Sequence, residues 1–413
     1  HVELPQAIET ARQNDQTFGL MSVDVDCFKQ INDLYGHSAG DKVLDEIGRR
    51  LSAHLGPEDK VYRLSGDEFV AILQLGEDHA CLSRVSSEII RSTSTPIEVD
   101  ESHIMATISM GAATYPEHGD DPETLLRASD VALYDAKENG RNTYSLYTTE
   151  LDREVRLRNQ LEQDLRFALE HNELELAYQP QVNAESGQLL GFEALARWHH
   201  KERGHINPQE FVAVAEQSGL IHALGNWALE TACREAARWP VHLTIAVNLS
   251  PLQLRDAQVV SCVRRALDLT GLAPERLELE ITEGVFVFDT AQVRETLDEL
   301  RQMGVGIAMD DFGTGYSSLS YLTRMPLTKL KIDRSFVTNF TQGKADDAIV
   351  NCVVGLSKSL RLSVVAEGVE TESQVAALSG AGCDILQGYY FGRPTKSPLE
   401  VIEQLSRDVK LRA

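Results

Sequence analysis

Residues 304–313 read GVGIAMDDFG, an apolar run that ends near two neighbouring aspartates, Asp310 and Asp311. Seven similar runs lie in the same half of the chain, at 174–181, 190–198, 242–250, 276–283, 327–335, 362–370 and 383–392. Stretches with helical spacing separate most of these runs. Eight strand-like runs with helices between them, in about 215 residues, predict a closed (β/α)8 barrel of the α/β class.

Several of these runs share a polar residue near the C-terminal end. These residues are Asn248, Glu280, Asp310, Lys331, Glu367 and Gln387. In a (β/α)8 barrel the C-terminal ends of the strands form the face that carries the active site. We therefore expect the six side chains to converge on one mouth.

Oxygen donors dominate this predicted mouth, with Glu193, Asn248, Glu280, Asp310, Asp311 and Glu367. Mg²⁺ and Mn²⁺ prefer such ligands, and crowded carboxylates repel each other unless cations neutralise them. The pattern predicts two metal ions that clamp a phosphodiester and activate a water molecule. Lys331 is placed to hydrogen-bond that water, and Arg197 to hold a phosphate oxygen. Taken singly, each acid is equally well explained as a helix N-cap or a solvated loop charge, so the joint pattern carries the prediction.

The second half of the chain contains eight motifs in a fixed order. They are YQP, Glu193-Ala194-Leu195, VNLS, ELEITE, DDFGTGYSS, KIDRSF, AEGVE and QGYYFGRP. With these motifs, residues from about 155 to 405 resemble the EAL family of cyclic-di-GMP phosphodiesterases. The resemblance implies a modified TIM barrel that hydrolyses cyclic di-GMP to the linear dinucleotide pGpG with two Mg²⁺ or Mn²⁺ ions.

The same resemblance implies a role for each matching residue. Glu193, Asn248, Glu280 and Asp310 are expected to ligate metal, with Asp311 serving the second ion. Lys331 and Glu367 are expected to orient or deprotonate the water. Gln179, Arg197 and Gln387 are expected to contact the dinucleotide or order the site. Glu283 is expected to steady the 310–318 loop, which in the family couples dimer packing to metal binding.

The first segment alternates strand and helix signals. Strands are predicted at 20–28 and 103–115, helices at 40–55 and 122–140, and a hairpin at 61–73 around a Ser-Gly-Asp turn. Mixed strands and hairpins indicate an α+β domain.

A charged amphipathic helix is predicted at 148–172. We place the first domain at 1–150, a connecting helix at 151–172 and the second domain at 173–413. This helix can act as a rigid lever or a coiled-coil seam, although packing onto the barrel is the commoner use of its apolar positions.

The predicted hairpin and the first strand bring acidic and basic residues together. Asp24 and Asp67 are suited to hold Mg²⁺ against a triphosphate, and Gly66 lets the backbone approach a nucleotide. Three basic side chains can neutralise the phosphates of such a nucleotide, namely Lys29, Lys137 and Arg141. Asn32 and Asp41 offer an amide and a carboxylate that suit a guanine edge.

Three motifs, VDVDCFKQINDLYGHSAGD, RLSGDEF and YDAKENGRN, resemble the GGDEF family of diguanylate cyclases. The resemblance implies a nucleotidyl-cyclase-like α+β fold over 20–145. It also implies that Asp24, Asp67 and Glu68 serve metal binding and catalysis, and that Asn32 and Asp41 select the guanine of GTP.

The chain departs from the GGDEF pattern at three places. Ser65 replaces the first glycine, and it would be strained if that position needs a positive φ. Gly56-Pro57-Glu58-Asp59 contains no arginine where the family has an inhibitory Arg-x-x-Asp site, so product inhibition through that site is not expected. The usual Asp-x-Leu-Thr start is absent, so we expect a fragment of a longer protein with an upstream sensor.

Composition limits the classes of partner. The formal net charge of −24 argues against a nucleic acid polymer or an anionic membrane surface as the main partner. The sequence has no run of 18 apolar residues. Six separated cysteines with no CxxC pair predict reduced, mostly buried thiols of a cytoplasmic protein, although a missing N-terminal part could anchor the full-length protein to a membrane.

Three functions remain open at this point. The first is an active EAL phosphodiesterase that its GGDEF-like domain regulates by binding GTP. The second is a bifunctional enzyme that also condenses two GTP molecules, which requires a homodimer because each cyclase domain holds one. The third is a catalytically silent cyclic-di-GMP receptor, which degenerate metal positions would favour. We see no such degeneracy in the second domain and therefore favour the first function.

Overall fold

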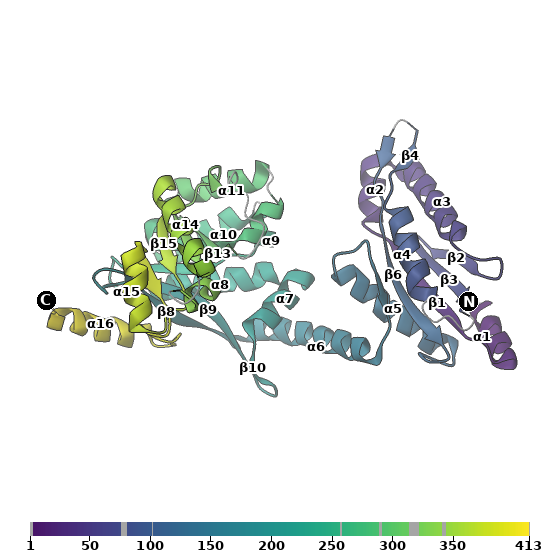
Figure 1. Ribbon diagram of the computed structural model, residues 1–413, viewed down its shortest axis with the longest axis horizontal. Helices are drawn as coiled ribbons and strands as arrows, with labels where there is room; N and C mark the ends of the chain where they lie inside the picture. Colours follow the sequence, from purple (N-terminus) through teal and green to yellow (C-terminus); the bar gives the residue numbers. More distant parts are fainter. Residues whose placement is uncertain are drawn as a thin grey trace. The chain divides into compact units, whose positions relative to one another are not determined.

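A computed structural model describes residues 3–75, 81–100, 102–256, 258–288, 291–313, 322–340 and 344–412. The chain divides into two compact units, residues 1–160 and 161–413. The division lies inside helix α6, Thr149–His171, which is the helix that the sequence predicts at 148–172. Figure 1 shows α6 leaving the first unit and entering the second.

The first unit is built on a five-stranded sheet with the strand order β2-β3-β1-β6-β7. Its strands are β1 Phe18–Val25, β2 Lys60–Ser65, β3 Glu68–Gln74, β6 Ile108–Tyr115 and β7 Tyr144–Leu146. The helices are α1 Glu3–Asn14, α2 Phe28–Tyr35, α3 His37–Ala53, α4 Cys81–Thr93 and α5 Pro122–Glu138. This arrangement confirms the predicted α+β fold. The strand predicted at 103–115 is two separate strands, β5 (Ser102–Ile104) and β6. β5 pairs with β4 (Ile97–Val99), and the strand conformation is interrupted between β5 and β6.

Alternation along β1 explains why helices cover both faces of this sheet. Phe18 and Leu20 belong to the core cluster that includes residues of α1 and α5. Met21 and Val23 belong to a different cluster, with residues of α3 and α4. Successive side chains of a strand point to opposite faces, so a strand that is buried along almost its whole length needs cover on both sides.

The predicted hairpin is present between β2 and β3. Ser65 pairs with Glu68, which leaves Gly66 and Asp67 as a two-residue turn. Gly66 has φ 52°, while Ser65 is absent from the residues with positive φ. Ser65, which replaces the first glycine of the family motif, therefore carries no strain from a positive φ.

The second unit is a closed barrel with the strand order β9-β11-β12-β13-β14-β15-β16-β8, which β8 closes by pairing with β9. Its strands are β8 Leu174–Asn183, β9 Leu189–His200, β11 Thr244–Asn248, β12 Leu277–Thr282, β13 Gly306–Phe312, β14 Lys329–Ile332, β15 Ser363–Ala366 and β16 Ile385–Gln387. A short strand, β10 (Gly204–Ile206), pairs antiparallel with the C-terminal end of β9. The predicted eight-stranded barrel is confirmed, with one modification. β8 runs antiparallel to both of its neighbours, while the pairs from β9 through β11 to β16 are parallel.

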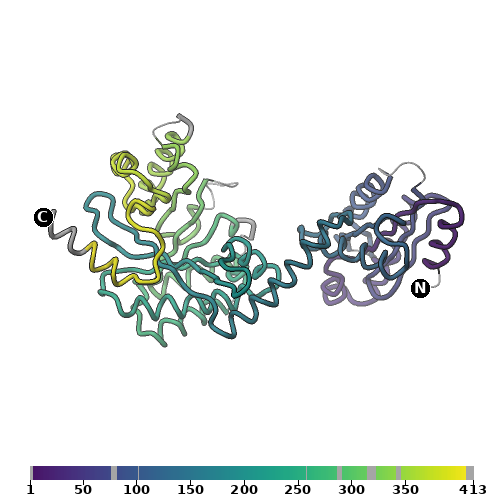
Figure 2. The backbone as a smooth tube through the Cα atoms, turned by 90° about the horizontal axis from the view of Figure 1, so that it is seen from below, coloured from purple at the N-terminus to yellow at the C-terminus, as the bar shows by residue number. Residues whose placement is uncertain are grey.

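Helices follow most of the parallel strands and surround the barrel (Figure 2). They are α7 Pro208–Ser218, α8 Ile221–Ala236, α9 Pro251–Leu254, α10 Gln258–Thr270, α11 Ala291–Gln302, α13 Arg334–Thr338, α14 Lys344–Leu360, α15 Glu372–Ala381 and α16 Pro398–Arg412, with 3-10 turns η1 Pro274–Arg276 and η2 Glu283–Phe288. One large apolar cluster holds strands and helices together. Among the described residues, no helix is both long and apolar enough to cross a membrane.

The C-terminal half of α6 packs onto the barrel. Leu161, Leu165 and Ala168 are buried in one cluster with Trp198 and Phe211. Packing onto the barrel is the commoner use of the apolar positions of such a helix. The prediction of mostly buried cysteines is wrong, because only Cys233 and Cys383 of the six free thiols are buried.

Candidate active site

Four carboxylates surround one buried lysine at the mouth of the barrel. The Lys331 Nζ atom lies 2.7 Å from Glu280 Oε2, 3.0 Å from Asp310 Oδ2, 3.6 Å from Glu193 Oε2 and 2.6 Å from Glu367 Oε1. The side chain of Lys331 is only 1% exposed. These residues come from β9, β12, β13, β14 and the segment directly after β15. The structure thus brings together the strand-end residues that the sequence expects at one mouth.

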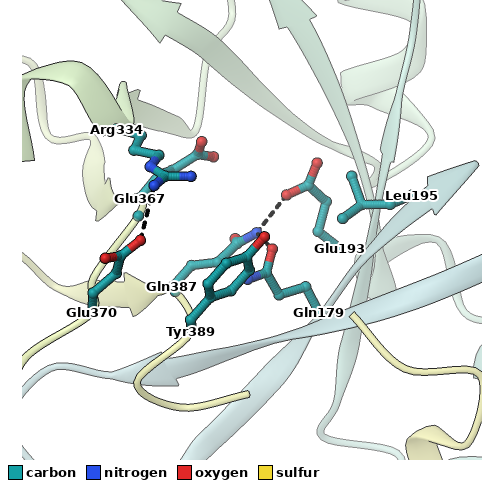
Figure 3. Close-up of a pocket in the computed structure, with 10 residues that line it drawn as sticks. Gln179, Glu193, Leu195, Arg334, Glu367, Glu370, Gln387 and Tyr389 are labelled. Atoms are coloured by element: carbon teal, nitrogen blue, oxygen red, sulfur yellow. Dashed lines mark hydrogen bonds and ion pairs between the residues drawn. The ribbon is translucent and has the colours of Figure 1, made fainter. Parts of the chain in front are cut away.

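Two amide side chains donate hydrogen bonds to Glu193, and a third amide accepts from one of these two. Asn248 Nδ2, at the end of β11, donates to Glu193 Oε1 at 2.8 Å. Gln387 Nε2, at the end of β16, donates to Glu193 Oε2 at 2.6 Å and to Gln179 Oε1 at 3.1 Å. Figure 3 shows Glu193, Gln387 and Gln179 on one wall of this pocket, with Glu367 on the opposite side. Gln179 sits directly opposite Glu193 because β8 pairs antiparallel with β9.

The burial of so many charges shifts their pKa values in opposite directions. Burial on its own would raise the pKa of Glu193, but the Lys331 ammonium and the amide donors outweigh it and lower that pKa. Burial and then the Glu193 charge raise the pKa of Glu280 well above its ordinary value. Burial also raises the pKa of Glu367, to about 8. Although burial opposes the charge of Lys331, the surrounding carboxylates raise its pKa well above the ordinary value.

The site has the composition of a divalent cation site. Glu193, Glu280 and Asp310 each offer an oxygen, and these oxygens lie within 4.8 Å of one another. Oε1 of Glu280 is buried without a hydrogen-bond partner, and an orphaned buried carboxylate oxygen is costly. One lysine cannot balance the surrounding acids, and an all-oxygen donor set is the one that Mg²⁺ and Mn²⁺ prefer. The residues present therefore fit such ions.

Asp310 and Asp311 both lie at the mouth because β13 is irregular. Neighbouring residues of a regular strand point to opposite faces. Here the register between β13 and β14 shifts between Met309 and Phe312, and Asp311 has φ 54°. Aspartate tolerates that backbone conformation better than most residues. Burial, followed by the charge of Asp310, raises the pKa of Asp311 to about 6.

Glu283 anchors the segment after these aspartates. Its Oε1 atom accepts a 2.8 Å hydrogen bond from the backbone N–H of Gly313. Of the 310–318 loop that Glu283 is expected to steady, residues 314–318 lie outside the described part of the chain.

Two cavities open beside the acidic cluster. One of about 210 Å³ is lined by Gln179, Glu193, Glu367, Arg334 and Tyr389, among others. A larger one of about 410 Å³ has an apolar lining that includes Leu195 and Val247, with Arg197, Asn248 and Asp311 at its polar side. Arg197 is half-buried, which lowers the pKa of its guanidinium.

Sequence reasoning missed several lining residues of the smaller cavity, among them Arg334 and Tyr389. Arg334 pairs with Glu370 at 2.9 Å, and Tyr389 lies under the guanidinium of Arg393 at 4.3 Å from the ring centroid. Their positions directly after the KID and QG segments were the available signal, since both segments end in the mouth.

A second acidic group lies in the first unit. Asp24 pairs with Glu68 across β1 and β3, and Asp67 occupies the adjacent turn. Lys137 Nζ lies 2.7 Å from Asp24 Oδ2. Burial raises the pKa of Asp24 despite this lysine. The predicted metal residues and one predicted phosphate-binding lysine are therefore neighbours.

The other predicted nucleotide residues lie on nearby elements. Lys29 and Asn32 are on α2, Asp41 is on α3 and Arg141 is in the turn after α5, with φ 62°. Asn32 packs tightly against α3, because a Cβ atom on Gly40 would lie 2.1 Å from its Oδ1. Gly40 thus leaves room for the Asn32 amide against α3.

The stretch that lacks the inhibitory arginine has a structural role. Asp59 Oδ2 accepts from the backbone N–H of Gly56, and its Oδ1 accepts from that of Gln74. These bonds tie the turn before β2 to the end of β3.

Comparison with known families covers both units. The model of the EAL domain matches residues 162–394, and that of the "Diguanylate cyclase, GGDEF domain" matches residues 1–143.

Among curated relatives, an uncharacterized signaling protein of Caulobacter vibrioides is 44% identical over 394 residues, which cover 95% of this chain and 49% of that protein. The bifunctional diguanylate cyclase/cyclic di-GMP phosphodiesterase MucR of Pseudomonas aeruginosa is 42% identical, over 95% of this chain and 58% of MucR. The cyclic di-GMP phosphodiesterase NbdA of the same organism is 38% identical, over 97% of this chain and 52% of NbdA. The chain spans about half the length of these relatives.

Solved structures resemble the second unit. The PaMucR phosphodiesterase in complex with c-di-GMP is 46% identical, with a TM-score of 0.56, over 58% of this chain and 99% of that one. An EAL domain protein from Listeria monocytogenes is 30% identical, with a TM-score of 0.53, over 59% of this chain and 96% of that one.

Proposed function

Because the chain belongs to the family of tandem GGDEF–EAL signalling proteins, we propose that its second domain hydrolyses cyclic di-GMP to linear pGpG. The observation that carries this proposal is the buried cluster in which Glu193, Glu280 and Asp310 converge around Lys331. Relatives that match nearly all of this chain are named cyclic di-GMP phosphodiesterases, which supports the same activity.

The acidic cluster would hold two divalent cations, Mg²⁺ or Mn²⁺. Glu193, Asn248, Glu280 and Asp310 are the proposed ligands, with Asp311 serving the second ion. When bound, the cations supply Lewis-acid polarisation of the phosphodiester and acidify a water molecule.

Lys331 and Glu367 have different roles at the reacting phosphate. The pKa of Lys331 lies well above its ordinary value, so the side chain stays an ammonium and donates hydrogen bonds to negative oxygen atoms. The pKa of Glu367 is raised to about 8, so its ionised form is a stronger base than an ordinary carboxylate and is the proposed proton acceptor for an attacking water. The Lys331 Nζ atom and the Glu367 Oε1 atom lie 2.6 Å apart.

The two cavities are suited to the rest of the dinucleotide. The larger one joins an apolar wall to Arg197, so it can take a purine base while the guanidinium holds a phosphate oxygen. Gln179 and Gln387 line the smaller one beside Glu193, where they order the site and contact the dinucleotide.

We propose that the first domain binds GTP with Mg²⁺ and regulates the phosphodiesterase. Asp24, Asp67 and Glu68 would hold the metal, and Lys29, Lys137 and Arg141 would neutralise the phosphates. Asn32 and Asp41 would read the guanine edge. A second candidate is that the domain also makes cyclic di-GMP as a homodimer. The unstrained Ser65 favours this candidate, because it removes one objection to an intact hairpin.

The full chain is incubated with cyclic di-GMP and Mg²⁺ or Mn²⁺, with and without GTP, and the nucleotides are separated by chromatography. We expect pGpG, which a chelator abolishes and GTP accelerates. Incubation with GTP alone tests the cyclase. No pGpG with either metal would refute the phosphodiesterase and favour a silent receptor.

Glu193→Ala distinguishes an enzyme from a receptor. Loss of a metal ligand removes turnover, while cyclic di-GMP binding through the cavities persists. The direct measurement is equilibrium binding of the dinucleotide in parallel with pGpG release. A variant that retains wild-type turnover would contradict the assigned role of Glu193.

A further inference from the structure

Gln181 lies inside the barrel, directly opposite Gln387 across the antiparallel pair of β8 and β16. The two side chains are almost fully buried, with 1% and 3% of each residue exposed. Gln181 Nε2 donates to Gln387 Oε1 at 2.9 Å. Gln181 stands two residues after Gln179, so both side chains point to the same face of β8.

The charge on Glu193 determines the direction of every bond in this amide chain. An ionised carboxylate only accepts hydrogen bonds, so Gln387 must turn its NH2 group toward Glu193. The carbonyl oxygen of Gln387 then faces Gln181, where it needs a donor because it is buried. Gln181 is the donor. This order follows from the chemistry of the groups and not from an arbitrary choice of amide orientation.

We infer that Gln181 is a positioning residue for the metal site, an inference that rests on the function proposed above. By donating to Gln387, it holds the Gln387 amide with its NH2 group toward Glu193. If the Gln387 amide were flipped by half a turn, its oxygen would lie 2.6 Å from the carboxylate oxygen of Glu193, where its nitrogen now lies. The two acceptors repel each other, and Glu193 would leave the position where its oxygen meets those of Glu280 and Asp310.

Loss of this donor should affect metal binding more than substrate binding. Gln181 reaches Glu193 only through Gln387 and is not among the residues that line the larger cavity, such as Arg197 and Leu195. Outer groups that orient metal ligands are typically worth about 10–100-fold in metal affinity. Removal of Gln181 should therefore weaken Mn²⁺ binding about 10-fold, which is a larger change than the one expected in the KM for cyclic di-GMP.

The test replaces Gln181 by methionine, which has a similar size and no N–H donor. Gln188→Met is the matched control, because Gln188 is exposed near the turn that joins β8 to β9. Mn²⁺ binding to the full chain is measured by calorimetry, and kcat and KM are measured at saturating and limiting Mn²⁺. We expect weaker Mn²⁺ binding and a lower kcat at limiting metal for Gln181→Met only.

A double-mutant cycle with Gln387→Met separates positioning from packing. If Gln181 acts through Gln387, adding Gln181→Met to Gln387→Met should weaken Mn²⁺ binding no further. Melting temperatures measure the loss of packing independently. Should Gln181→Met fail to fold, Gln181→Leu is used in the same cycle, because it also lacks the donor.

Unchanged Mn²⁺ affinity in a folded Gln181 variant, or an additive loss in the double variant, would overturn the inference. If the wild-type chain makes no pGpG, the proposed function fails, yet the Mn²⁺ titration still decides whether Gln181 orients Glu193. Failure of the two proposals is therefore distinguishable.

Discussion

The ammonium of Lys331 lies 2.7 Å from Oε2 of Glu280, and both side chains are essentially inaccessible to solvent, with 1% and 0% exposed. The other oxygen of Glu280 has no hydrogen-bond partner. Burial of a carboxylate that is only half satisfied is unfavourable for folding. Its retention at the mouth of the barrel is explained if it binds a cation.

Lys331→Met should destabilise the metal-free chain and abolish turnover. It leaves four buried or half-buried carboxylates without their cation, and breaking a buried ion pair costs about 3–5 kcal/mol of unfolding free energy. Calorimetric melting in chelator and in Mn²⁺ checks this, because the metal should restore much of the lost stability. Lys329→Met is the control. Lys329 sits two residues earlier on β14 and pairs with Glu278 at 2.8 Å, so its loss of stability should not depend on metal and should leave turnover intact.

Glu280→Gln should stabilise the metal-free chain and weaken metal binding. Burial and the Glu193 charge raise the pKa of Glu280 in the folded state, so the ionised form destabilises the fold above its unfolded pKa. An uncharged amide that still accepts from Lys331 should therefore raise the unfolding free energy by roughly 1–3 kcal/mol at pH 8. Denaturant unfolding in chelator and Mn²⁺ calorimetry measure the two effects. Lower stability of the variant in chelator would contradict the assignment.

The metal-free chain should lose stability as the pH rises from about 4.5 to about 8. The pKa of Glu280 is raised, and that of Glu367 is raised to about 8, both chiefly by burial. The folded state therefore binds more protons than the unfolded chain within this window, and its stability falls as those protons leave. Melting temperatures between pH 5 and 8 in chelator test this. Saturating Mg²⁺ should flatten the profile, and an equal slope with and without Mg²⁺ would count against a metal at these carboxylates.

Glu283→Ala should raise the Mg²⁺ concentration needed for half-maximal activity about 10-fold. The variant removes the acceptor for the Gly313 N–H and so releases the segment that follows Asp310 and Asp311. Glu283→Gln is the matched control, since its amide oxygen can still accept that bond. Activity against Mg²⁺ concentration for both variants gives the answer, and equal behaviour of alanine and glutamine would mean that the bond to Gly313 does not matter.

Gly66→Ala should disturb the hairpin of the first unit, whereas Ser65→Gly should not improve it. Gly66 has φ 52°, where an L-residue pays about 1–2 kcal/mol, although a Cβ there meets open space. Ser65 has no such constraint, and its hydroxyl lies 3.3 Å from Glu68 Oε2. GTP binding by calorimetry should be weaker for Gly66→Ala only. Tighter binding by Ser65→Gly would show that a glycine is needed at that position.

Much of the fold and of the acidic site was predictable because each signal is local. Apolar runs such as 304–313 predicted strands, and parallel strands in a barrel present their C-terminal ends on one face. The strand-end residues around Lys331 and Glu193 were therefore expected together, and the structure places them together. The roles of these residues in turnover remain predictions that the experiments above test.

Several features could not be predicted in this way. The direction of β8 is invisible to an alternating pattern, which is the same for parallel and antiparallel strands. It nevertheless places Gln179 opposite Glu193 and Gln181 opposite Gln387. Likewise, the irregularity of β13 that brings Asp310 and Asp311 to the same mouth depends on pairing with β14.

By itself, the amino-acid sequence determined the two fold classes, the family resemblance and which oxygen donors can form a metal site, because hydrophobic period and side-chain chemistry are properties of the chain alone. Only the tertiary structure decided which of those donors contact the same lysine or the same amide. Distances between residues as remote as Gln181 and Gln387 exist only after the barrel closes. Buried pKa values follow from those distances and from the exclusion of water, so the electrostatics of the site belong to the fold.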